Sequence, residues 1–133
     1  MSSESPVITI VTQRAEADCG IVVLAMYLGR TYEDVLVAAA QLDTKIHKRG
    51  MWVRQIEATA LALGVKLRRR HRWDIDTSEG ILSLNSTTMR REAHVVVLKN
   101  GLIFDTDGSV WEPDVFFATA RFKPTILLER DER

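Results

Sequence analysis

The chain has 133 residues, of which 46% are hydrophobic, and 18 lysine and arginine residues balance 18 aspartate and glutamate residues. We therefore expect one domain spanning residues 1–133, and the zero formal net charge disfavours a dedicated nucleic-acid binder. One cysteine excludes an internal disulfide, and no Cys/His cluster has zinc-site spacing, so no metal and no cofactor are expected.

The N-terminal residues MSSESPVITIVTQ have neither the basic stretch nor the long apolar core of a signal peptide. No apolar run in the chain approaches the roughly 18 residues that a membrane span requires. We therefore expect a cytoplasmic protein without a membrane span. Within this region VITIVT (7–12) is apolar and β-branched, which predicts a short strand before the loop 13–18.

Two helices are predicted after this loop. Residues 19–28 are apolar on all sides apart from the Tyr27 hydroxyl, a pattern typical of a helix that is buried all round, and Gly29 ends it. A second helix is expected within residues 30–42, where a variant of the capping box begins at Thr31.

A polar loop at 43–50 separates these helices from a third one, expected at 51–64. The third helix should bury one apolar face made by Trp52, Ile56, Ala60 and Leu63.

The second half of the chain has the character of strands. Strands are expected at 65–73, 80–85 and 124–129, with a hairpin at 93–108 that turns at Lys99-Asn100-Gly101 and a short helix at 112–120 begun by Pro113. Helices followed by antiparallel strands indicate an α+β fold, with an N-terminal helical part packed on a C-terminal antiparallel sheet.

Cys19 lies where a helix can activate a thiol. The loop ends at Asp18, a good N-cap residue, so Cys19 falls in the first turn, where unpaired N–H groups lower a thiol pKa. Gly20 allows another backbone to approach the sulfur closely. A lone cysteine before an apolar run is more often a small buried hydrophobe, and only its partners argue otherwise.

A nucleophilic cysteine needs a base, and the chain has three histidines. His47 lies in a polar loop and His71 in a cluster of arginines, whereas His94 opens the apolar strand HVVVL. Asp105 closes the next strand, so the two side chains are expected as neighbours across the hairpin. This predicts a nucleophile, a base and an orienting carboxylate in the order Cys19, His94, Asp105.

Gln13 precedes Cys19 by six residues. Acyl transfer needs donors directed at a developing oxyanion, and the Gln13 amide and the Cys19 N–H are candidates for that role.

The opening motif resembles that of a known family. Gln13, four residues, Asp18-Cys19-Gly20 and then Leu24, Met26 and Gly29 resemble the Q-x4-D-C-G-x3-L-x-M opening of the bacteriocin-processing cysteine peptidases, which cut double-glycine leader peptides. Later segments resemble that family in the same order, over roughly residues 10–110. The resemblance implies a papain-like fold, a Cys19–His94–Asp105 triad, Gln13 in the oxyanion hole and a peptide or protein substrate.

The chain departs from this family where Asp-Pro usually follows the histidine strand, because it has DTDG (105–108) instead. Asp107 thus competes with Asp105 as the orienting carboxylate, and Asp105 is favoured because it closes the strand directly. The substrate remains open, as does the choice between hydrolysis, deamidation and transpeptidation. The alternative function is a catalytically weak or inactive peptidase fold that binds an extended peptide or protein.

Residues 66–72 (KLRRRHR) are a local basic cluster. A solvated strand edge is favoured over a phosphate-binding patch, because acidic residues elsewhere cancel the charge. The three tryptophans are expected as core or cleft-wall residues.

Overall fold

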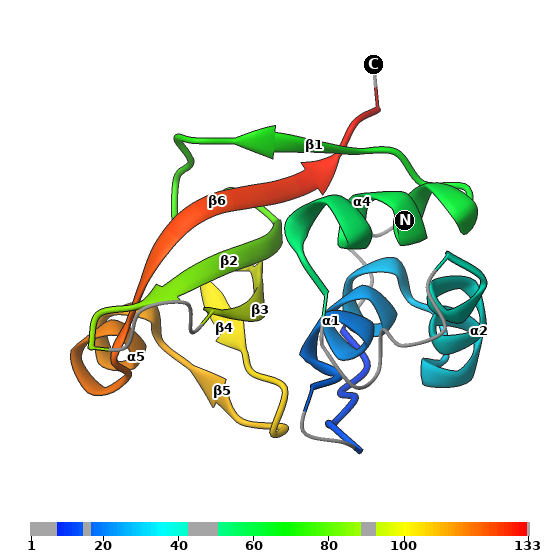
Figure 1. Cartoon of the computed structure of the whole chain (residues 1–133). Coiled ribbons are helices and arrows are strands. Elements are labelled where there is room, and N and C mark those ends of the chain that lie inside the picture. Colours follow the sequence, from blue (N-terminus) through cyan, green and yellow to red (C-terminus); the bar gives the residue numbers. More distant parts are fainter. Residues whose placement is uncertain (1–7, 15–16, 43–50, 89–92, 133) are drawn as a thin grey trace, which may run out of the picture.

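The computed structural model describes residues 8–14, 17–42, 51–88 and 93–132. The loop expected at 43–50, with His47, lies outside the described residues. The elements in chain order are α1 Cys19–Leu28, α2 Tyr32–Leu42, α4 Val53–Ala62, β1 Leu67–Arg70, β2 Gly80–Ser86, β3 Ala93–Lys99, β4 Leu102–Phe104, β5 Val110–Trp111, α5 Pro113–Thr119 and β6 Phe122–Arg130 (Figure 1). Within these ranges the strands form one antiparallel sheet in the order β1-β6-β2-β3-β4-β5, which confirms the α+β class.

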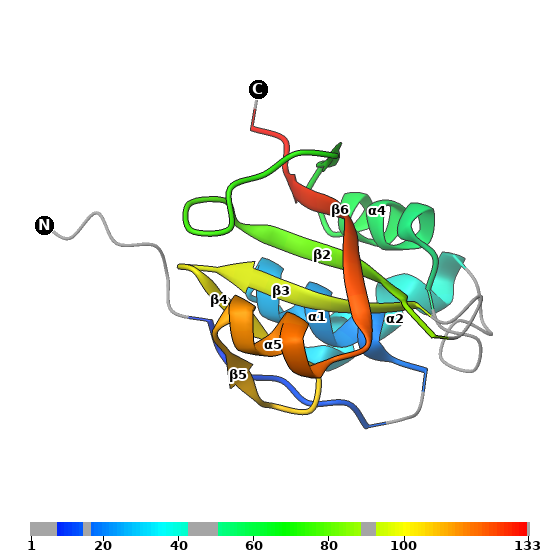
Figure 2. The same cartoon turned by 90° about the vertical axis from the view of Figure 1, so that its left-hand side faces the viewer.

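The sheet separates two apolar layers because neighbouring strand residues point to opposite faces. In β3, Val95 and Val97 pack into the cluster that contains α1, α2 and α4. Val96 and Leu98 pack into a second cluster with Phe116 of α5. The views agree with this division, because α5 lies on the face of the sheet opposite α1 (Figure 2).

Helix α1 is the centre of the larger layer. Its residues from Gly20 to Met26 are buried, as is Leu28, and the helix packs against β3 and β2 as well as α2 and α4. Gly29 ends α1 with a left-handed φ of 68°, a conformation that disfavours other residues. The prediction of a helix buried all round is confirmed, and Cys19 is its first residue.

Helices α2 and α4 also occupy the predicted places. The Asp34 N–H donates to Thr31 Oγ1 (3.1 Å) at the start of α2, and Ile56 and Ala60 of α4 are fully buried. The prediction for Trp52 was wrong, because its side chain is 66% exposed. Trp52 precedes the first helical turn with extended backbone (φ −74°, ψ 162°), so the helical periodicity of α4 does not place it on the buried face.

The strand predicted at 7–12 is not formed, since residues 8–12 have no strand pairing in the structure. Their β-branched side chains favour a strand only where a sheet edge accepts them. The segment is instead tied at its end, where Gln13 N donates to the Thr106 carbonyl (2.8 Å).

The β3–β4 hairpin forms with the predicted turn. Asn100 (φ 54°) and Gly101 (φ 73°) both have positive φ, as a two-residue type I′ turn requires. Pro124 lies within β6 opposite Leu84, beside a register shift in the β2 ladder. On its other side β6 pairs with β1 only through Leu127–Arg130. Pro124 lies before this paired stretch, so its missing N–H removes no hydrogen bond from the β1–β6 ladder.

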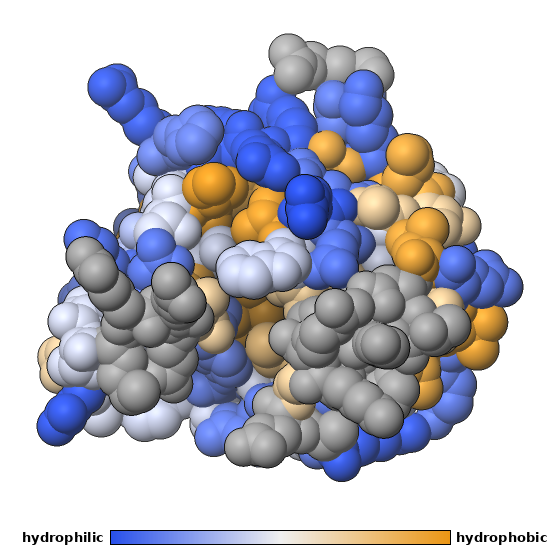
Figure 3. Space-filling model, in the orientation of Figure 1, coloured by the Kyte–Doolittle hydropathy of each residue, from blue (hydrophilic) through white to orange (hydrophobic). Residues whose placement is uncertain are grey.

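The surface in this view is mixed in polarity. Hydrophilic residues gather at the top, around β1, and hydrophobic residues show on the α4 side and also nearer the centre (Figure 3). The large apolar side chains exposed on α2, on α4 and just before α4 are Val37, Leu42, Trp52 and Leu61. Among the described residues, none of the helices has both the length and the apolar character to cross a membrane.

Candidate active site

Cys19 begins α1 and is partly exposed, so its sulfur lies at the positive end of a buried helix. The neighbouring Gly20 is required by packing. A Cβ at that position would come within 2.9 Å of Met51 Cβ and Sδ. The expectation was that another backbone approaches the sulfur here, whereas the group packed against Gly20 is the Met51 side chain.

Asp18 is buried and occupies the N-cap position of α1, but its side chain makes no capping hydrogen bond. Its Oδ2 instead accepts hydrogen bonds from the Tyr32 hydroxyl (2.6 Å) and from Arg14 N (2.9 Å). Burial, the hydrogen bond to Asp18 and the charge of Asp18 raise the pKa of Tyr32 to about 12. The Arg14 guanidinium lies 4.2 Å from the centre of the Tyr32 ring. Asp18 therefore anchors α2 to the loop before Cys19.

His94 and Asp105 meet at the end of the hairpin opposite its turn. His94 Nε2 lies 2.7 Å from Asp105 Oδ1, and the two side chains are 20% and 19% exposed. Phe122 of β6 packs on the imidazole at 5.6 Å between ring centres. Asp107, the competing carboxylate, accepts hydrogen bonds from the backbone N–H and the hydroxyl of Ser109. The structure therefore pairs His94 with Asp105.

The electrostatics of this pair favour a charged imidazole. Burial alone would lower the pKa of His94, but hydrogen bonds and electrostatic interactions with Asp105 and Cys19 raise it to about 9. Burial would raise the pKa of Asp105, but the hydrogen bond and charge of His94 and the N–H of Thr106 hold that pKa below its usual range. Because Nε2 is held by Asp105, Nδ1 is the ring nitrogen that remains for the Cys19 thiol.

Gln13 is brought to the same hairpin by Thr106, the residue after Asp105. The Thr106 hydroxyl donates to Gln13 Oε1 (2.5 Å), and Gln13 N donates to the Thr106 carbonyl (2.8 Å). All four residues predicted for the site therefore belong to one constellation: Cys19 and Asp105 interact with His94, and Gln13 is linked to Asp105 through Thr106.

Sequence reasoning missed three residues that support the site: Tyr32, Thr106 and Phe122. Thr106 had one signal in the sequence, its place directly after Asp105 in the segment DTDG (105–108). Tyr32 and Phe122 reach the site through contacts over long sequence separations, and no local pattern marks them.

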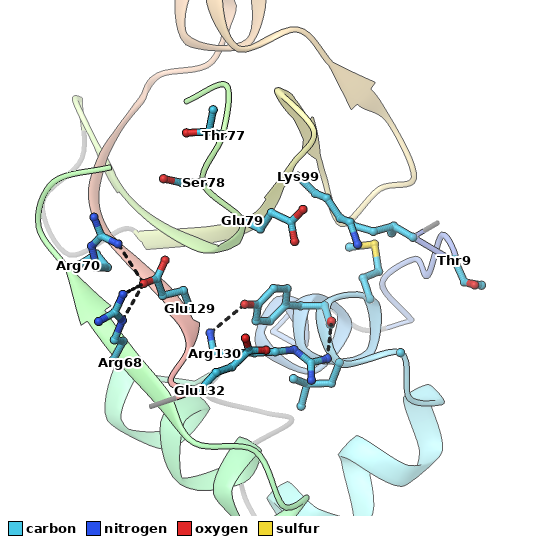
Figure 4. Close-up of a pocket in the computed structure, with 15 residues that line it drawn as sticks. Thr9, Arg68, Arg70, Thr77, Ser78, Glu79, Lys99, Glu129, Arg130 and Glu132 are labelled. Atoms are coloured by element: carbon cyan, nitrogen blue, oxygen red, sulfur yellow. Dashed lines mark hydrogen bonds and ion pairs between the residues drawn. The ribbon is translucent and has the colours of Figure 1, made fainter. Parts of the chain in front are cut away.

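A pocket of about 790 Å³ lies at the other end of α1, lined by Tyr27 and Gly29 among others (Figure 4). Many of its charged groups are paired within its own wall. Arg68 and Arg70 both contact Glu129, and Arg130 N donates to the Tyr27 hydroxyl (2.9 Å). The thiol is at the first residue of α1 and this pocket surrounds the last turn, so the pocket is not part of the Cys19 site.

The basic cluster at 66–72 is largely neutralised in the fold. In addition to the pairs with Glu129, Arg69 contacts Glu57 (2.7 Å) and Lys66 lies 3.8 Å from Asp131. β1 is an edge strand of the sheet, in agreement with the prediction of a solvated strand edge for this cluster. The strand therefore presents much less net positive charge than its sequence indicates.

No protein-family model matches the chain, and the search of curated proteins found no match. In the ranges that the structure describes, His, Cys, Asp and Glu side chains form no group of three or more suited to holding a metal ion.

Proposed function

We propose that the chain is a papain-like cysteine peptidase that uses Cys19 as nucleophile, His94 as acid and base, Asp105 as orienting carboxylate and Gln13 in the oxyanion hole. One observation carries the proposal: His94 interacts with Asp105 and with the only cysteine of the chain, and both interactions favour the imidazolium. An imidazolium beside a thiol at a helix N-terminus is the setting in which cysteine becomes a thiolate nucleophile.

In the first half of the reaction the Cys19 sulfur adds to the carbonyl carbon of the scissile amide. The negative charge that forms on the carbonyl oxygen is stabilised by the Cys19 N–H and the Gln13 amide. When the carbon–nitrogen bond breaks, His94 gives its proton to the leaving amine, and the acyl group remains on Cys19 as a thioester.

In the second half His94, now neutral, takes a proton from a water molecule as the water oxygen adds to the thioester carbon. The carbon–sulfur bond then breaks, the carboxylic acid leaves and the thiolate–imidazolium pair is restored. Asp105 stays ionised throughout, because its pKa is held low, and it keeps Nε2 protonated so that Nδ1 faces the sulfur.

The arrangement of elements supports the papain-like assignment. A buried helix carries the nucleophile at its first residue, and in the antiparallel sheet the histidine lies on β3 while the carboxylate directly follows the neighbouring strand β4. The substrate class is a peptide or protein, by the resemblance of the opening motif to leader peptidases. The alternative function is a domain of the same fold that binds an extended peptide without cleaving it.

Alkylation of the single cysteine by iodoacetamide at pH 6 tests the proposal. We expect wild-type Cys19 to react at least about tenfold faster than the same residue in His94→Ala, because the variant has no imidazolium to stabilise the thiolate. His71→Ala is the matched control, since His71 is exposed at the end of β1 and should leave the rate unchanged. A wild-type rate equal to that of a free peptide thiol would refute the thiolate–imidazolium pair.

Cleavage is separated from binding by incubating the protein with a peptide library and identifying any acyl adduct on Cys19 by mass spectrometry. Peptide cleavage that is lost in Cys19→Ala supports the peptidase. Peptide binding that is equal in wild type and Cys19→Ala, without cleavage or an adduct in either, supports the binding domain instead.

A further inference from the structure

We infer that Thr106 is a positioning residue, whose hydroxyl sets the orientation of the Gln13 carboxamide in the oxyanion hole. The inference rests on the proposed function, because Gln13 has this role only if Cys19 carries out acyl transfer. Thr106 itself touches neither the thiol nor the reacting carbonyl, and it acts through Gln13.

Three hydrogen bonds place Thr106 between the two halves of the site. Its hydroxyl donates to Gln13 Oε1 (2.5 Å), its carbonyl accepts from Gln13 N (2.8 Å) and its N–H donates to Asp105 Oδ1 (2.7 Å). The residue is 1% exposed, so water does not readily replace these partners. Thr106 therefore holds both the backbone and the side chain of Gln13 against the hairpin that carries Asp105.

The hydroxyl bond decides which end of the carboxamide faces the carbonyl oxygen of a substrate. A glutamine side chain ends in one acceptor and one donor group, and the wrong end would repel an oxyanion. Because the Thr106 hydroxyl donates to Oε1, the NH2 group is the end that is left to point away from Thr106. A site held in this way needs no reorganisation when the oxyanion forms, which is the condition for effective electrostatic stabilisation.

Two substitutions isolate the hydroxyl. Thr106→Val keeps the β-branched shape and both backbone hydrogen bonds but removes the donor, and Thr106→Ser keeps the donor. Thr125→Val is the matched control, because the Thr125 hydroxyl donates to the Ser83 carbonyl (3.1 Å), between β6 and β2. Each protein is assayed for acylation by p-nitrophenyl acetate, which passes through an oxyanion, and for alkylation by iodoacetamide, which does not.

For Thr106→Val we expect acylation to slow about 10- to 100-fold. This loss should not exceed the loss of rate that follows when an oxyanion donor is removed entirely. The iodoacetamide rate and its pH profile should stay within twofold of wild type, since Thr106→Val keeps the backbone N–H that donates to Asp105 and keeps the contact between Asp105 and His94. Thr106→Ser should restore at least half of the wild-type acylation rate, and Thr125→Val should match wild type. Adding Thr106→Val to Gln13→Ala should cause no further loss of acylation, because the hydroxyl acts on the oxyanion through Gln13.

Equal acylation rates in Thr106→Val and wild type would overturn the inference while leaving the peptidase standing. Equal loss of acylation and alkylation would also overturn it, because it would show general damage to the site. If wild-type Cys19 neither acylates nor alkylates faster than a free thiol, the proposed function fails for a separate reason, and the geometry is then tested without turnover.

That second measurement is the ¹⁵N relaxation of the Gln13 side-chain amide, assigned by its absence in Gln13→Ala. The amide should be as rigid as the backbone in wild type and in Thr106→Ser, and should become mobile in Thr106→Val. A Gln13 amide that is equally rigid, or equally mobile, in wild type and Thr106→Val contradicts the inference whatever the activity of the protein.

Discussion

Replacing Asp105 by asparagine keeps the size of the side chain and removes the charge beside His94. His94 Nε2 lies 2.7 Å from Asp105 Oδ1, and the partners of His94 raise its pKa from 6.5 to about 9. At about 1.4 kcal/mol per pKa unit, this difference corresponds to about 3 kcal/mol in favour of the protonated ring. Cys19 supplies part of this stabilisation, so Asp105→Asn should remove a large part of the stabilisation of the protonated ring but not all of it.

We expect the pKa of His94 to fall well below 9 in Asp105→Asn, because burial then outweighs much of what remains to stabilise the charged ring. The assay follows the His94 Cε1–H resonance by NMR between about pH 5 and pH 10, with the resonance assigned by its loss in His94→Gln. Asp107→Asn is the matched control. Asp107 binds Ser109 rather than His94, so the titration midpoint of His94 should stay near 9.

The same pair predicts how stability depends on pH. Because the folded pKa of His94 is raised above 6.5, its contribution to stability is complete below about pH 6.5 and is lost as the pH rises through about 9. The pKa of Asp105 is lowered below 3.8, so its contribution is present above that pH and is lost as the pH falls through the lowered value. Between about pH 4.5 and 6.5, the free energy of unfolding in urea should therefore be about 1–3 kcal/mol lower for Asp105→Asn than for wild type. At pH 10 the difference should be much smaller.

A wild-type midpoint at or below 6.5 would show that Asp105 does not hold the imidazolium. Equal effects of Asp105→Asn and Asp107→Asn on the midpoint would contradict the assignment of Asp105 as the partner. Either result removes the orienting carboxylate from the proposed mechanism.

Two further substitutions test the frame around the site. Tyr32→Phe removes a hydroxyl that donates to the buried Asp18 carboxylate at 2.6 Å, so the free energy of unfolding should fall by about 1–3 kcal/mol in urea, and a loss below about 0.5 kcal/mol would contradict the anchoring role. Gly80→Ala would place a Cβ 2.2 Å from the Leu128 carbonyl oxygen, so the β2–β6 ladder must shift, at a cost of about 2 kcal/mol or more. Thermal unfolding measures this loss, and an unchanged Tm would show that the ladder can yield there.

The parts of the fold that the sequence predicts have local causes. The run from Cys19 to Leu28 is apolar on every side and stops at a glycine, so both the burial and the end of α1 follow from neighbouring residues. The hairpin turn follows in the same way from Asn100-Gly101, which accept positive φ. The proximity of His94 and Asp105 could be predicted because the hairpin turn at Asn100-Gly101 brings the two strand ends together.

The parts that the sequence does not predict depend on distant partners. Residues 8–12 have the composition of a strand, but they form no ladder, and the chain is held instead by Thr106, which lies about a hundred residues away. Asp18 is a typical N-cap residue, but its side chain contacts Tyr32 rather than the start of its own helix. In both cases the local preference is not realised, and the residues make a tertiary hydrogen bond instead.

The choice between Asp105 and Asp107 shows why strand register alone does not decide the site. Val97 pairs with Phe104, so extending the ladder by three residues would put His94 directly opposite Asp107, with Asp105 only diagonal to it. The ladder ends at Phe104, however, and Asp105 N donates to the Ser109 carbonyl (2.9 Å), which closes residues 105–109 into a tight loop. That loop turns Asp107 towards Ser109 and leaves Asp105 as the carboxylate that His94 contacts. The residue after Asp105 is a threonine, whose N–H donates to the Asp105 carboxylate and whose hydroxyl donates to Gln13.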